Sequence, residues 1–310
     1  MNVLFAINEK FVPGFLTAAL SLCVNNPGHH RFFVMNDGLS SKAEVRIHKT
    51  LKKFDCEISL VNIGKGAFDA PLYTSLPRYY SQSINRLLPQ LAVPSDVHRL
   101  LYLDSDIIVN GSLQSFYDSD FQNRFLVVPS VRHDGNDGGP FWDSETMVYN
   151  EIKIPLKPET LYFNSGVLLM NVDLFRTIDR GFYDPVVTAH KNEIVFADQD
   201  ILNLAFEGRV VNVIDRRLNC TIAENIRMRK GEYRWVKKEA KVIHFVVNPK
   251  PWQASGYRPP FFKIYMKYYR KEGHFLSYLW KYGLWWLMKP VHFVTHCWRK
   301  LRSLHAKAKE

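Results

Sequence analysis

Two aspartates interrupt an otherwise apolar stretch of this sequence. Residues 99–109 run Arg-Leu-Leu-Tyr-Leu-Asp-Ser-Asp-Ile-Ile-Val, and such a short apolar run predicts a buried strand. Aspartates are rarely buried unless they are paired or bound to a metal ion. Asp104-Ser105-Asp106 therefore predicts a divalent metal site with hard oxygen ligands. The alternative is a turn or helix N-cap, for which the apolar flanks leave little solvated room.

Composition sets broad limits on the fold class. The chain has 310 residues and is 46% apolar, which permits a sizeable core in two domains or in one large α/β domain. Its four cysteines lie far apart without C-x-x-C spacing, which argues against a zinc site and a disulfide framework and fits a reducing, cytosolic compartment. Residues 1–9 lack a basic lead and a cleavage pattern, so they predict a first strand and not a signal peptide.

Strand and helix patterns alternate at the start of the chain. Apolar runs predict strands over residues 2–7, 31–35 and 56–61, separated by helices over 12–24 and 40–51. This order predicts a parallel α/β sheet, whose ligands bind at the carboxyl ends of the strands. No Gly-x-Gly-x-x-Gly or Gly-x-x-x-x-Gly-Lys follows the first strand, which disfavours a dinucleotide fold and a P-loop enzyme. A metal ion on the aspartate pair would instead hold phosphates.

Three central segments carry polar residues in unusual places. A helix predicted over residues 79–89 carries Arg86, either as a solvated cation or in a buried role. Residues 130–160 predict a long loop, and loops of this length are usually functional. We therefore expect His133 and Asp134 to lie on the side of a site where an acceptor substrate would bind. A strand predicted over residues 162–171 contains Asn164-Ser165-Gly166, where the glycine permits close approach to the backbone.

Two later segments add candidate site residues. Asp198-Gln199-Asp200 precedes a helix predicted over residues 201–206; Asp198 has an alternative role as its N-cap, whereas Gln199 has no comparable structural explanation. A strand predicted over residues 241–247 contains His244. A lone histidine in an apolar strand is often a core residue, but the carboxylate site lacks a third protein ligand, which favours His244. Imidazole among carboxylates suits Mn²⁺ better than Mg²⁺.

The last fifty residues carry most of the positive charge. Residues 261–310 account for +9 of the net charge of +11. Aromatic and aliphatic residues from Phe275 to Leu301 recur at helical spacing, but Lys281 and Lys289 interrupt them before the roughly 18 residues that a spanning helix needs. The pattern predicts a helix in an anionic membrane interface. Packing on the catalytic domain is an alternative; a nucleic-acid patch is disfavoured because no base-reading module accompanies it.

Four stretches, in order, resemble the family 8 glycosyltransferases, and in particular the bacterial galactosyl- and glucosyltransferases that build lipopolysaccharide or lipooligosaccharide. They are LLYLDSDIIV, YFNSGVLLMN, FADQDILN and HFVVNPKPW, and the resemblance covers roughly residues 1–255. It implies a GT-A fold, a UDP-sugar donor, Mn²⁺ with Mg²⁺ as an alternative, and hexose transfer to a glycolipid with retention. We expect a catalytic domain over residues 1–258 and a membrane-association tail over 259–310, on the inner face of a bacterial cytoplasmic membrane.

The resemblance also implies residue roles, position by position. Asp104, Asp106 and His244 are the expected metal ligands, and Asp198 and Gln199 are the expected catalytic residues at the donor hydroxyls and the anomeric face. The expected donor-binding residues are Ala6, Asn8, Lys10, Arg86, Asp104, Ser105, Asn164, Val247 and Lys250.

Three of these positions depart from the family pattern. Asn8 stands where many relatives have Asp, Lys10 where they often have Asn, and Val247 where Gly is usual. Asn8 still offers an amide oxygen. Val247 keeps its N–H but restricts the backbone.

Other functions stay open at this point. One is a sugar nucleotidyltransferase, although no Gly-rich nucleotide loop follows the first strand. Others are transfer to a protein or polysaccharide acceptor, and a catalytically silent membrane-bound module that binds a sugar nucleotide. For a retaining transferase we favour same-face attack guided by the departing phosphate, because the Gln199 amide is a poor nucleophile.

Overall fold

The chain divides into two compact units, residues 1–248 and residues 249–310. The computed structural model describes residues 1–64, 68–130, 151–222, 230–246, 249–253 and 262–272, together with Leu276, Trp280 and Gly283. The boundary between the units lies ten residues before the predicted one, and the assignment of a catalytic domain and a membrane tail to residues 1–258 and 259–310 stays a prediction.

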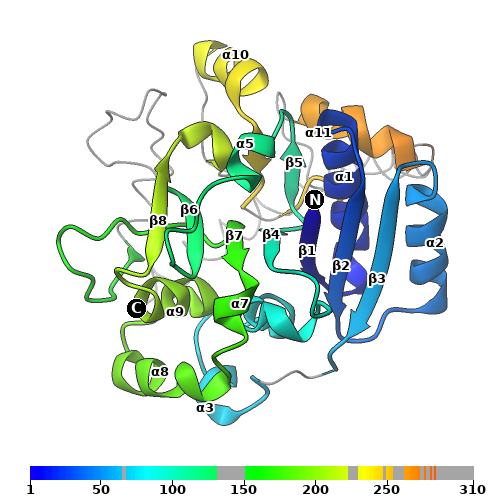
Figure 1. Ribbon diagram of the computed structural model, residues 1–310. Coiled ribbons are helices and arrows are strands. Elements are labelled where there is room, and N and C mark those ends of the chain that lie inside the picture. The colour runs from blue at the N-terminus through cyan, green and yellow to red at the C-terminus, as the bar shows by residue number, and fades with distance from the viewer. Residues whose placement is uncertain are drawn as a thin grey trace, which may run out of the picture. The chain divides into compact units, whose positions relative to one another are not determined.

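The first unit is organised around a seven-stranded sheet in the order β3-β2-β1-β4-β7-β6-β8 (Figure 1). The strands β3, β2, β1 and β4 run parallel to one another, whereas β7 is antiparallel to both β4 and β6. A second sheet has three strands in the order β5-β10-β9. The strands are β1 (Asn2–Ile7), β2 (His30–Asn36), β3 (Cys56–Asn62), β4 (Arg99–Leu103), β5 (Ile107–Val109), β6 (Leu126–Ser130), β7 (Val167–Asn171), β8 (Val210–Ile214), β9 (Cys220–Thr221) and β10 (Val242–His244).

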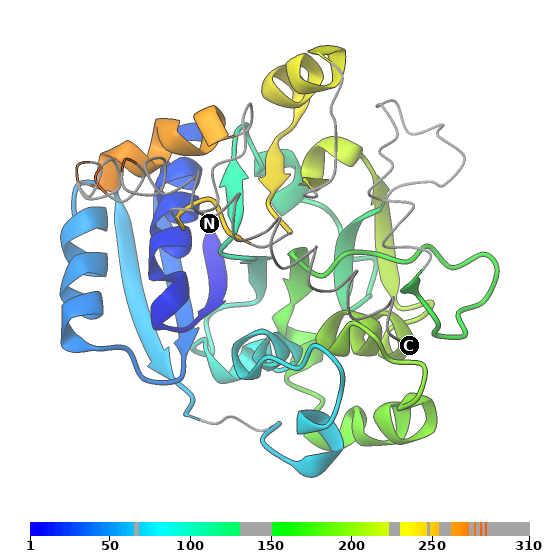
Figure 2. The same ribbon diagram turned by 180° about the vertical axis from the view of Figure 1, so that it is seen from behind.

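Helices cover both faces of the large sheet, and Figure 2 shows the same layers from behind. Alternate residues of β4 point to opposite faces, so Tyr102 joins one hydrophobic core and Leu101 the other. Residues of α1 and α2 fill the core on the Leu101 side, and residues of α7, α8 and α9 fill the core on the Tyr102 side. The helices are α1 (Val12–Asn25), α2 (Ser41–Leu51), α3 (Pro71–Thr74), α4 (Ser81–Ile84), α5 (Gln114–Tyr117), α7 (Val172–Phe175), α8 (Asp184–His190), α9 (Ala197–Ala205), α10 (Lys230–Glu239) and α11 (Phe262–Tyr269).

The early strand-helix alternation confirms the predicted α/β class. The predicted strands and helices of residues 2–61 correspond to β1, α1, β2, α2 and β3 to within two residues at each end. Ser40 caps α2, because its Oγ accepts the Ala43 N–H at 3.2 Å and satisfies one free donor of the first turn. The local sequence pattern was therefore sufficient to predict elements that each pack their own apolar face on the sheet.

The prediction of one strand over residues 99–109 was wrong in an informative way. The run divides into β4 in the large sheet and β5 in the small sheet, with Asp104-Ser105-Asp106 as the turn between them. Ser105 and Asp106 are nevertheless buried. A turn and a buried polar site, which the sequence presented as alternatives, thus occur together.

Four further elements differ from the sequence prediction. The helix predicted over residues 79–89 is replaced by α4 followed by the short 3-10 helices η2 (Asn85–Leu87) and η3 (Pro89–Leu91). The strand predicted over 162–171 begins only at Val167, and that over 241–247 ends at His244. The helix predicted over 201–206 begins earlier, at Ala197. In each case the polar residues of the candidate site lie at the altered boundary.

The second unit contains α11, which places its charged and aromatic residues on different faces. Tyr265 is buried, and its ring lies 6.3 Å from that of Trp252 and 5.7 Å from that of Tyr269. Lys263, Lys267 and Arg270 are exposed. Within the described part of the chain, none of the helices combines the length and apolar character required to cross a bilayer.

Candidate active site

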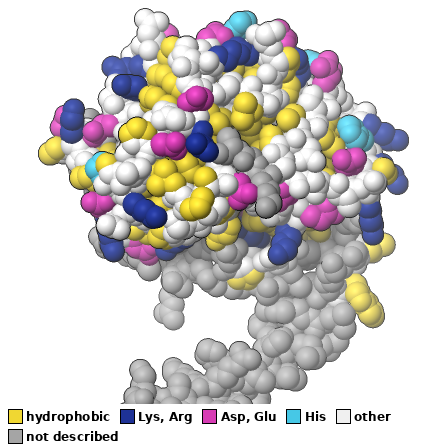
Figure 3. Space-filling model, turned by 90° about the horizontal axis from the view of Figure 1, so that it is seen from below, with side chains coloured by type: hydrophobic (Ala, Val, Ile, Leu, Met, Phe, Trp, Pro, Cys, Tyr) yellow, Lys and Arg dark blue, Asp and Glu magenta, His cyan; other side chains and the backbone are white. Residues whose placement is uncertain are grey.

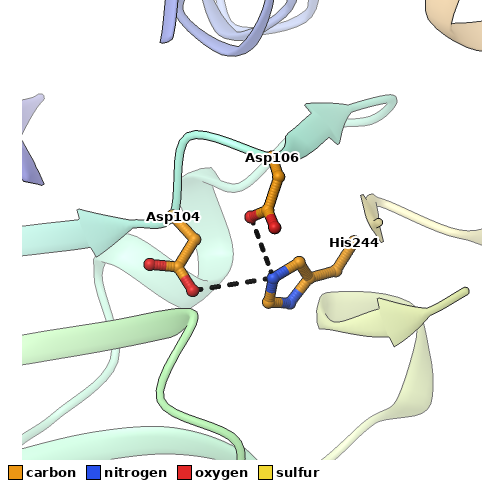
Figure 4. Close-up of side chains that lie close together, drawn as sticks. All are labelled: Asp104, Asp106 and His244. Carbon is orange, nitrogen blue, oxygen red and sulfur yellow. Dashed lines mark hydrogen bonds and ion pairs between the residues drawn. The ribbon is translucent and has the colours of Figure 1, made fainter. Parts of the chain in front are cut away.

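The two sheets bring Asp104, Asp106 and His244 together. Asp104 follows β4, Asp106 precedes β5, and the antiparallel pairing of β5 with β10 sets His244 opposite Ile107. The Nε2 atom of His244 lies 3.1 Å from Oδ1 of Asp106 and 3.6 Å from Oδ2 of Asp104 (Figure 4). One ligand atom from each of the three residues lies within 4.8 Å of the others. Two hard carboxylate oxygens and one imidazole nitrogen form a donor set suited to a divalent cation.

Gly166 makes this close arrangement possible. A Cβ atom at Gly166 would lie 2.2 Å from Cε1 of His244 and 2.9 Å from Oδ2 of Asp104. Both distances are below any normal contact. The backbone also fixes Asp104, because its N–H donates to the Gly166 carbonyl at 2.8 Å. The close approach to the backbone that was predicted at Asn164-Ser165-Gly166 is therefore made by the side chains of two candidate ligands, His244 and Asp104.

Arg86 is buried and joins two carboxylates. Its Nη2 lies 2.9 Å from Oδ1 of Asp104, and its Nε lies 3.1 Å from Oδ2 of Asp198. Burial alone would lower the pKa of Arg86, but the carboxylates of Asp104 and Asp198 raise it, so the guanidinium remains charged. The buried role considered for Arg86 is confirmed, and the alternative of a solvated cation is wrong.

The two oxygens of Asp104 face different partners. Oδ1 accepts the Tyr102 hydroxyl at 2.8 Å and the guanidinium of Arg86. Burial raises the pKa of Tyr102, so its hydroxyl keeps the proton that it donates. Oδ2 faces His244 and the backbone of Gly166. Such outer contacts orient a metal-ligating carboxylate, and this division of the two oxygens fits a metal ion on the Oδ2 side.

Asp198 and Gln199 lie in the first turn of α9, and both are buried. Asp198 accepts the Ser83 hydroxyl at 3.2 Å and faces Arg86. Burial raises the pKa of Asp198, and the nearby guanidinium of Arg86 offsets only part of this effect. The side chain of Asp198 does not cap the helix. Instead, Oδ2 of Asp200 accepts the N–H groups of Val195 and Phe196, which directly precede the helix. The N-cap alternative for Asp198 is therefore wrong.

Asn164 and Gln199 are hydrogen-bonded to each other. The Nδ2 group of Asn164 donates to Oε1 of Gln199 at 2.8 Å, and the Ser165 N–H donates to the same oxygen at 3.1 Å. Nε2 of Gln199 donates to the Tyr162 hydroxyl at 2.6 Å. Both predicted residues therefore belong to one buried polar network beside the cluster of candidate ligands.

The sequence matches a known family over most of this unit. Residues 2–256 match the model of glycosyl transferase family 8. The chain belongs to this family. Within it, the chain is 30% identical over 267 residues to the glycosyltransferase GlyB of Streptococcus pneumoniae serotype 4, covering 81% of this chain but 57% of that protein. It is 24% identical over 273 residues to the lipopolysaccharide 1,3-galactosyltransferase of Salmonella typhimurium, covering 83% and 74%.

A solved structure supports the fold expected from the resemblance. The galactosyltransferase LgtC, solved with donor and acceptor sugar analogues, matches with a TM-score of 0.66 at 22% identity, over 88% of this chain and 95% of that one. The expected GT-A fold is confirmed, and family membership identifies the chain as a glycosyltransferase.

Other predicted residues of this family 8 chain lie in several places. Ala6 and Asn8 lie at the carboxyl end of β1, the edge that also holds Asp104, because β1 and β4 are parallel. Oδ1 of Asn8 accepts the Lys10 N–H at 3.0 Å, and Lys10 is exposed. Lys250 belongs to the second unit, where it is buried and its N–H donates to Gln253 at 2.8 Å. The remaining predicted residues, His133, Asp134 and Val247, lie outside the described residues.

Sequence reasoning missed several polar residues that contact the predicted ones, among them Tyr102 and Asn219. Tyr102, in β4, contacts Asp104 directly after the strand, and its hydroxyl amid the Leu residues of β4 was an available signal. Asn219 follows η5 (Arg216–Leu218), and Oδ1 of Asn219 lies 3.1 Å from Nδ1 of His244. Asn219 carried no sequence signal, because its neighbours show neither periodicity nor a recognisable motif.

Proposed function

We propose that this family 8 enzyme transfers a hexose, galactose or glucose, from a UDP-sugar to a glycolipid acceptor such as a lipopolysaccharide core, with retention of anomeric configuration. The observation that carries the proposal is the convergence of Asp104, Asp106 and His244 beside the buried network of Asn164 and Gln199. The acceptor class rests on the relatives, of which one is named a lipopolysaccharide 1,3-galactosyltransferase.

Asp104, Asp106 and His244 would hold Mn²⁺, with Mg²⁺ as the alternative. A divalent cation in this position supplies neutralisation of the charge that develops on a diphosphate leaving group. The local arrangement favours a cation, because Oδ2 of Asp104 and Oδ1 of Asp106 both face His244, whereas Arg86 contacts Oδ1 of Asp104 and Asp198 on the other side. Buried carboxylates are costly unless they are paired or bound to a cation.

The remaining residues bind and orient the donor in this proposal. Asp198, with one oxygen on Ser83 and the other on Arg86, would accept hydrogen bonds from hydroxyl groups of the donor sugar. Gln199 would present a neutral amide near the anomeric centre, and an amide cannot form a stable covalent intermediate as a carboxylate can. Same-face attack, in which the departing phosphate receives the acceptor proton, therefore suits these groups better than double displacement. Ala6, Asn8 and Lys10 would hold uridine, and Lys250 would meet the diphosphate.

The proposal also includes attachment to an anionic membrane surface. Residues 261–310 contribute +9 to the net charge. Lys263 and Lys267 of α11 are exposed, as is Arg270 directly after it. Leu276 and Trp280, four residues apart, are 80% and 71% exposed. Basic residues with exposed large apolar side chains favour an interfacial site on anionic lipid. On the face of the molecule in Figure 3, by contrast, basic side chains are interspersed with acidic ones. A peripheral position on the inner face of a bacterial cytoplasmic membrane follows from this proposal.

The decisive experiment measures UDP release from UDP-galactose and UDP-glucose with Mn²⁺, with and without lipid-linked acceptor. Asp106→Asn should abolish metal-dependent turnover, because a neutral amide is a weaker ligand for a hard cation. Asp118→Asn is the matched control, since Asp118 is exposed and contacts Gln114. Pyrophosphate release would favour a nucleotidyltransferase, and donor binding without turnover would favour a silent module. Wild-type turnover by Asp106→Asn would defeat the metal assignment.

A further inference from the structure

A continuous chain of side-chain hydrogen bonds leads from the candidate metal ligand His244 to a carboxylate in α9. The successive heavy-atom distances are 3.1, 2.9, 2.8, 2.6 and 2.6 Å. Every member except Asn164 is buried, so water competes little for these bonds. The members, in order, are His244, Asn219, Asn164, Gln199, Tyr162 and Asp200.

The direction of the chain is fixed at the Asp200 end. Oδ2 of Asp200 accepts two backbone N–H groups, at 2.7 and 2.8 Å, and Oδ1 faces the Tyr162 hydroxyl at 2.6 Å. A carboxylate held by backbone donors acts as an acceptor, so Tyr162 donates its only hydroxyl proton to Asp200. The oxygen of Tyr162 must then accept from Gln199.

Two backbone N–H groups fix the direction through the amides. A backbone N–H can only donate, so the Gln199 atom that faces Ser165 N–H at 3.1 Å is the oxygen. The Asn164 atom that faces Gly166 N–H at 3.0 Å is likewise the oxygen. Nδ2 of Asn164 therefore donates to Gln199, and Oδ1 of Asn164 accepts from Nδ2 of Asn219.

This direction decides the state of His244. Because Nδ2 of Asn219 donates to Asn164, the atom of Asn219 that faces His244 is Oδ1, an acceptor. The Nδ1 atom of His244 must therefore carry the proton. In the neutral ring the lone pair then lies on Nε2, which is the atom that faces Oδ1 of Asp106 and Oδ2 of Asp104.

We propose that Asn219 is a positioning residue that holds His244 in the Nδ1–H tautomer and couples the metal ligand to Gln199. The part of the inference that concerns metal binding rests on the proposed function, whereas the tautomer of His244 does not depend on it. Without Asn219, the neutral ring would place its proton on Nε2, where it can donate to Asp106 at 3.1 Å. That proton occupies the lone pair that a metal needs, and the link from His244 to Gln199 is lost.

The tautomer is measured directly in the full-length, metal-free protein. Nitrogen NMR of ¹⁵N-histidine-labelled protein in chelator, at a pH where the ring is neutral, distinguishes Nδ1–H from Nε2–H; His244→Gln identifies the signals. The wild type should show Nδ1–H, and Asn219→Ala should show Nε2–H. An Nε2–H ring in the wild type, or an unchanged tautomer in Asn219→Ala, would overturn the inference.

Mn²⁺ titration supplies a second readout. Asn219→Ala should bind Mn²⁺ about 10–100-fold more weakly, the usual effect of losing a partner that orients a ligand. Asn219→Asp separates the two roles: its carboxylate still accepts from Nδ1, so Mn²⁺ affinity should stay within about threefold. The carboxylate cannot donate to Asn164, so kcat should fall while Mn²⁺ affinity holds. A tenfold loss of Mn²⁺ affinity in Asn219→Asp would contradict the inference, even if Asn219→Ala fails to fold.

A matched control separates positioning from general stability. Asn26 is equally buried, and its amide accepts the Leu113 N–H at 2.7 Å and donates to Leu22 and Gly111. Asn26→Ala should lower Tm without changing the His244 tautomer or Mn²⁺ affinity. If the tautomer responds to Asn219→Ala but no sugar transfer is found, the proposed function fails and the inference stands. If transfer occurs and the tautomer does not respond, the reverse holds.

Discussion

Gly166 is the position at which the smallest change should most disturb the candidate metal site. In Gly166→Ala, the new Cβ would lie 2.2 Å from Cε1 and 2.8 Å from Nδ1 of His244, and 2.9 Å from Oδ2 of Asp104. Carbon atoms in contact lie about 3.5–4.0 Å apart, so the His244 ring must retreat by roughly 1.3 Å. The ring is buried and its Nδ1 is bonded to Asn219, so this movement also strains its outer contact.

The size of that movement sets the expected effect. Metal–ligand distances tolerate only about 0.2 Å, and a misplacement of about 1 Å costs a catalytic group about 100-fold. We therefore expect Gly166→Ala to weaken Mn²⁺ binding at least about 100-fold and to lower UDP release in parallel. Overpacking of a tight site should also lower the free energy of unfolding by about 1–3 kcal/mol.

Calorimetric Mn²⁺ titration and denaturant unfolding would measure the two effects separately. Gly111→Ala is the control, because its Cβ would lie 3.3 Å from the flexible side chain of Lys241, a contact that a small shift relieves. It should leave Mn²⁺ affinity unchanged. If Gly166→Ala binds Mn²⁺ within about threefold of the wild type, close packing at Gly166 does not position the ligands, and the reasoning is refuted.

Three further predictions concern catalysis, pH and the membrane. Gln199→Ala should lower kcat far more than it raises the donor KM, as for a group that acts in the transition state; a pure KM effect in initial-rate assays would make Gln199 a binding residue. Burial raises the pKa of Asp198, so the folded protein holds this proton to higher pH than the unfolded chain does. The unfolding free energy should then fall as pH rises from the ordinary Asp pKa through the raised one, and Asp198→Asn should flatten that part of the pH profile; identical profiles would contradict this. Leu276→Ala/Trp280→Ala should weaken sedimentation with anionic vesicles, whereas Leu91→Ala, at an exposed site in the first unit, should not; equal binding by all three proteins would exclude the tail as the contact.

The elements that the sequence predicted well are those whose packing is local. β1, α1 and β2 each bury a continuous or periodic apolar set against the same sheet, so their patterns carry the information. The division of residues 99–109 into two strands cannot be read from the local pattern, because β5 leaves the large sheet to pair with β10, more than 130 residues later. Alternation within 99–109 looks the same whether the chain continues or changes sheets.

Burial of charge was the part of the site that local pattern could not predict. Arg86 lies in a polar segment, and its burial depends on carboxylates at Asp104 and Asp198, which are distant in sequence. The candidate ligands were predicted from chemistry that the sequence displays, two acidic residues and one His in apolar runs. Asn219 shows nothing comparable, because its contribution exists only after β9 and β10 pair and place it beside His244.

Several buried charged residues, which local sequence rules do not predict, lie together in the candidate active site. Asp104 and Asp198 flank the buried guanidinium of Arg86, and Asp106 lies beside His244, although buried like charges oppose folding. Arg86 contacts Oδ1 of Asp104 and Oδ2 of Asp198, whereas Oδ2 of Asp104 and Oδ1 of Asp106 face His244. A fold selected for stability alone would replace such a group with apolar residues. In the proposed function a cation would bind on the His244 side, and the stability that buried carboxylates cost there would become affinity for that cation.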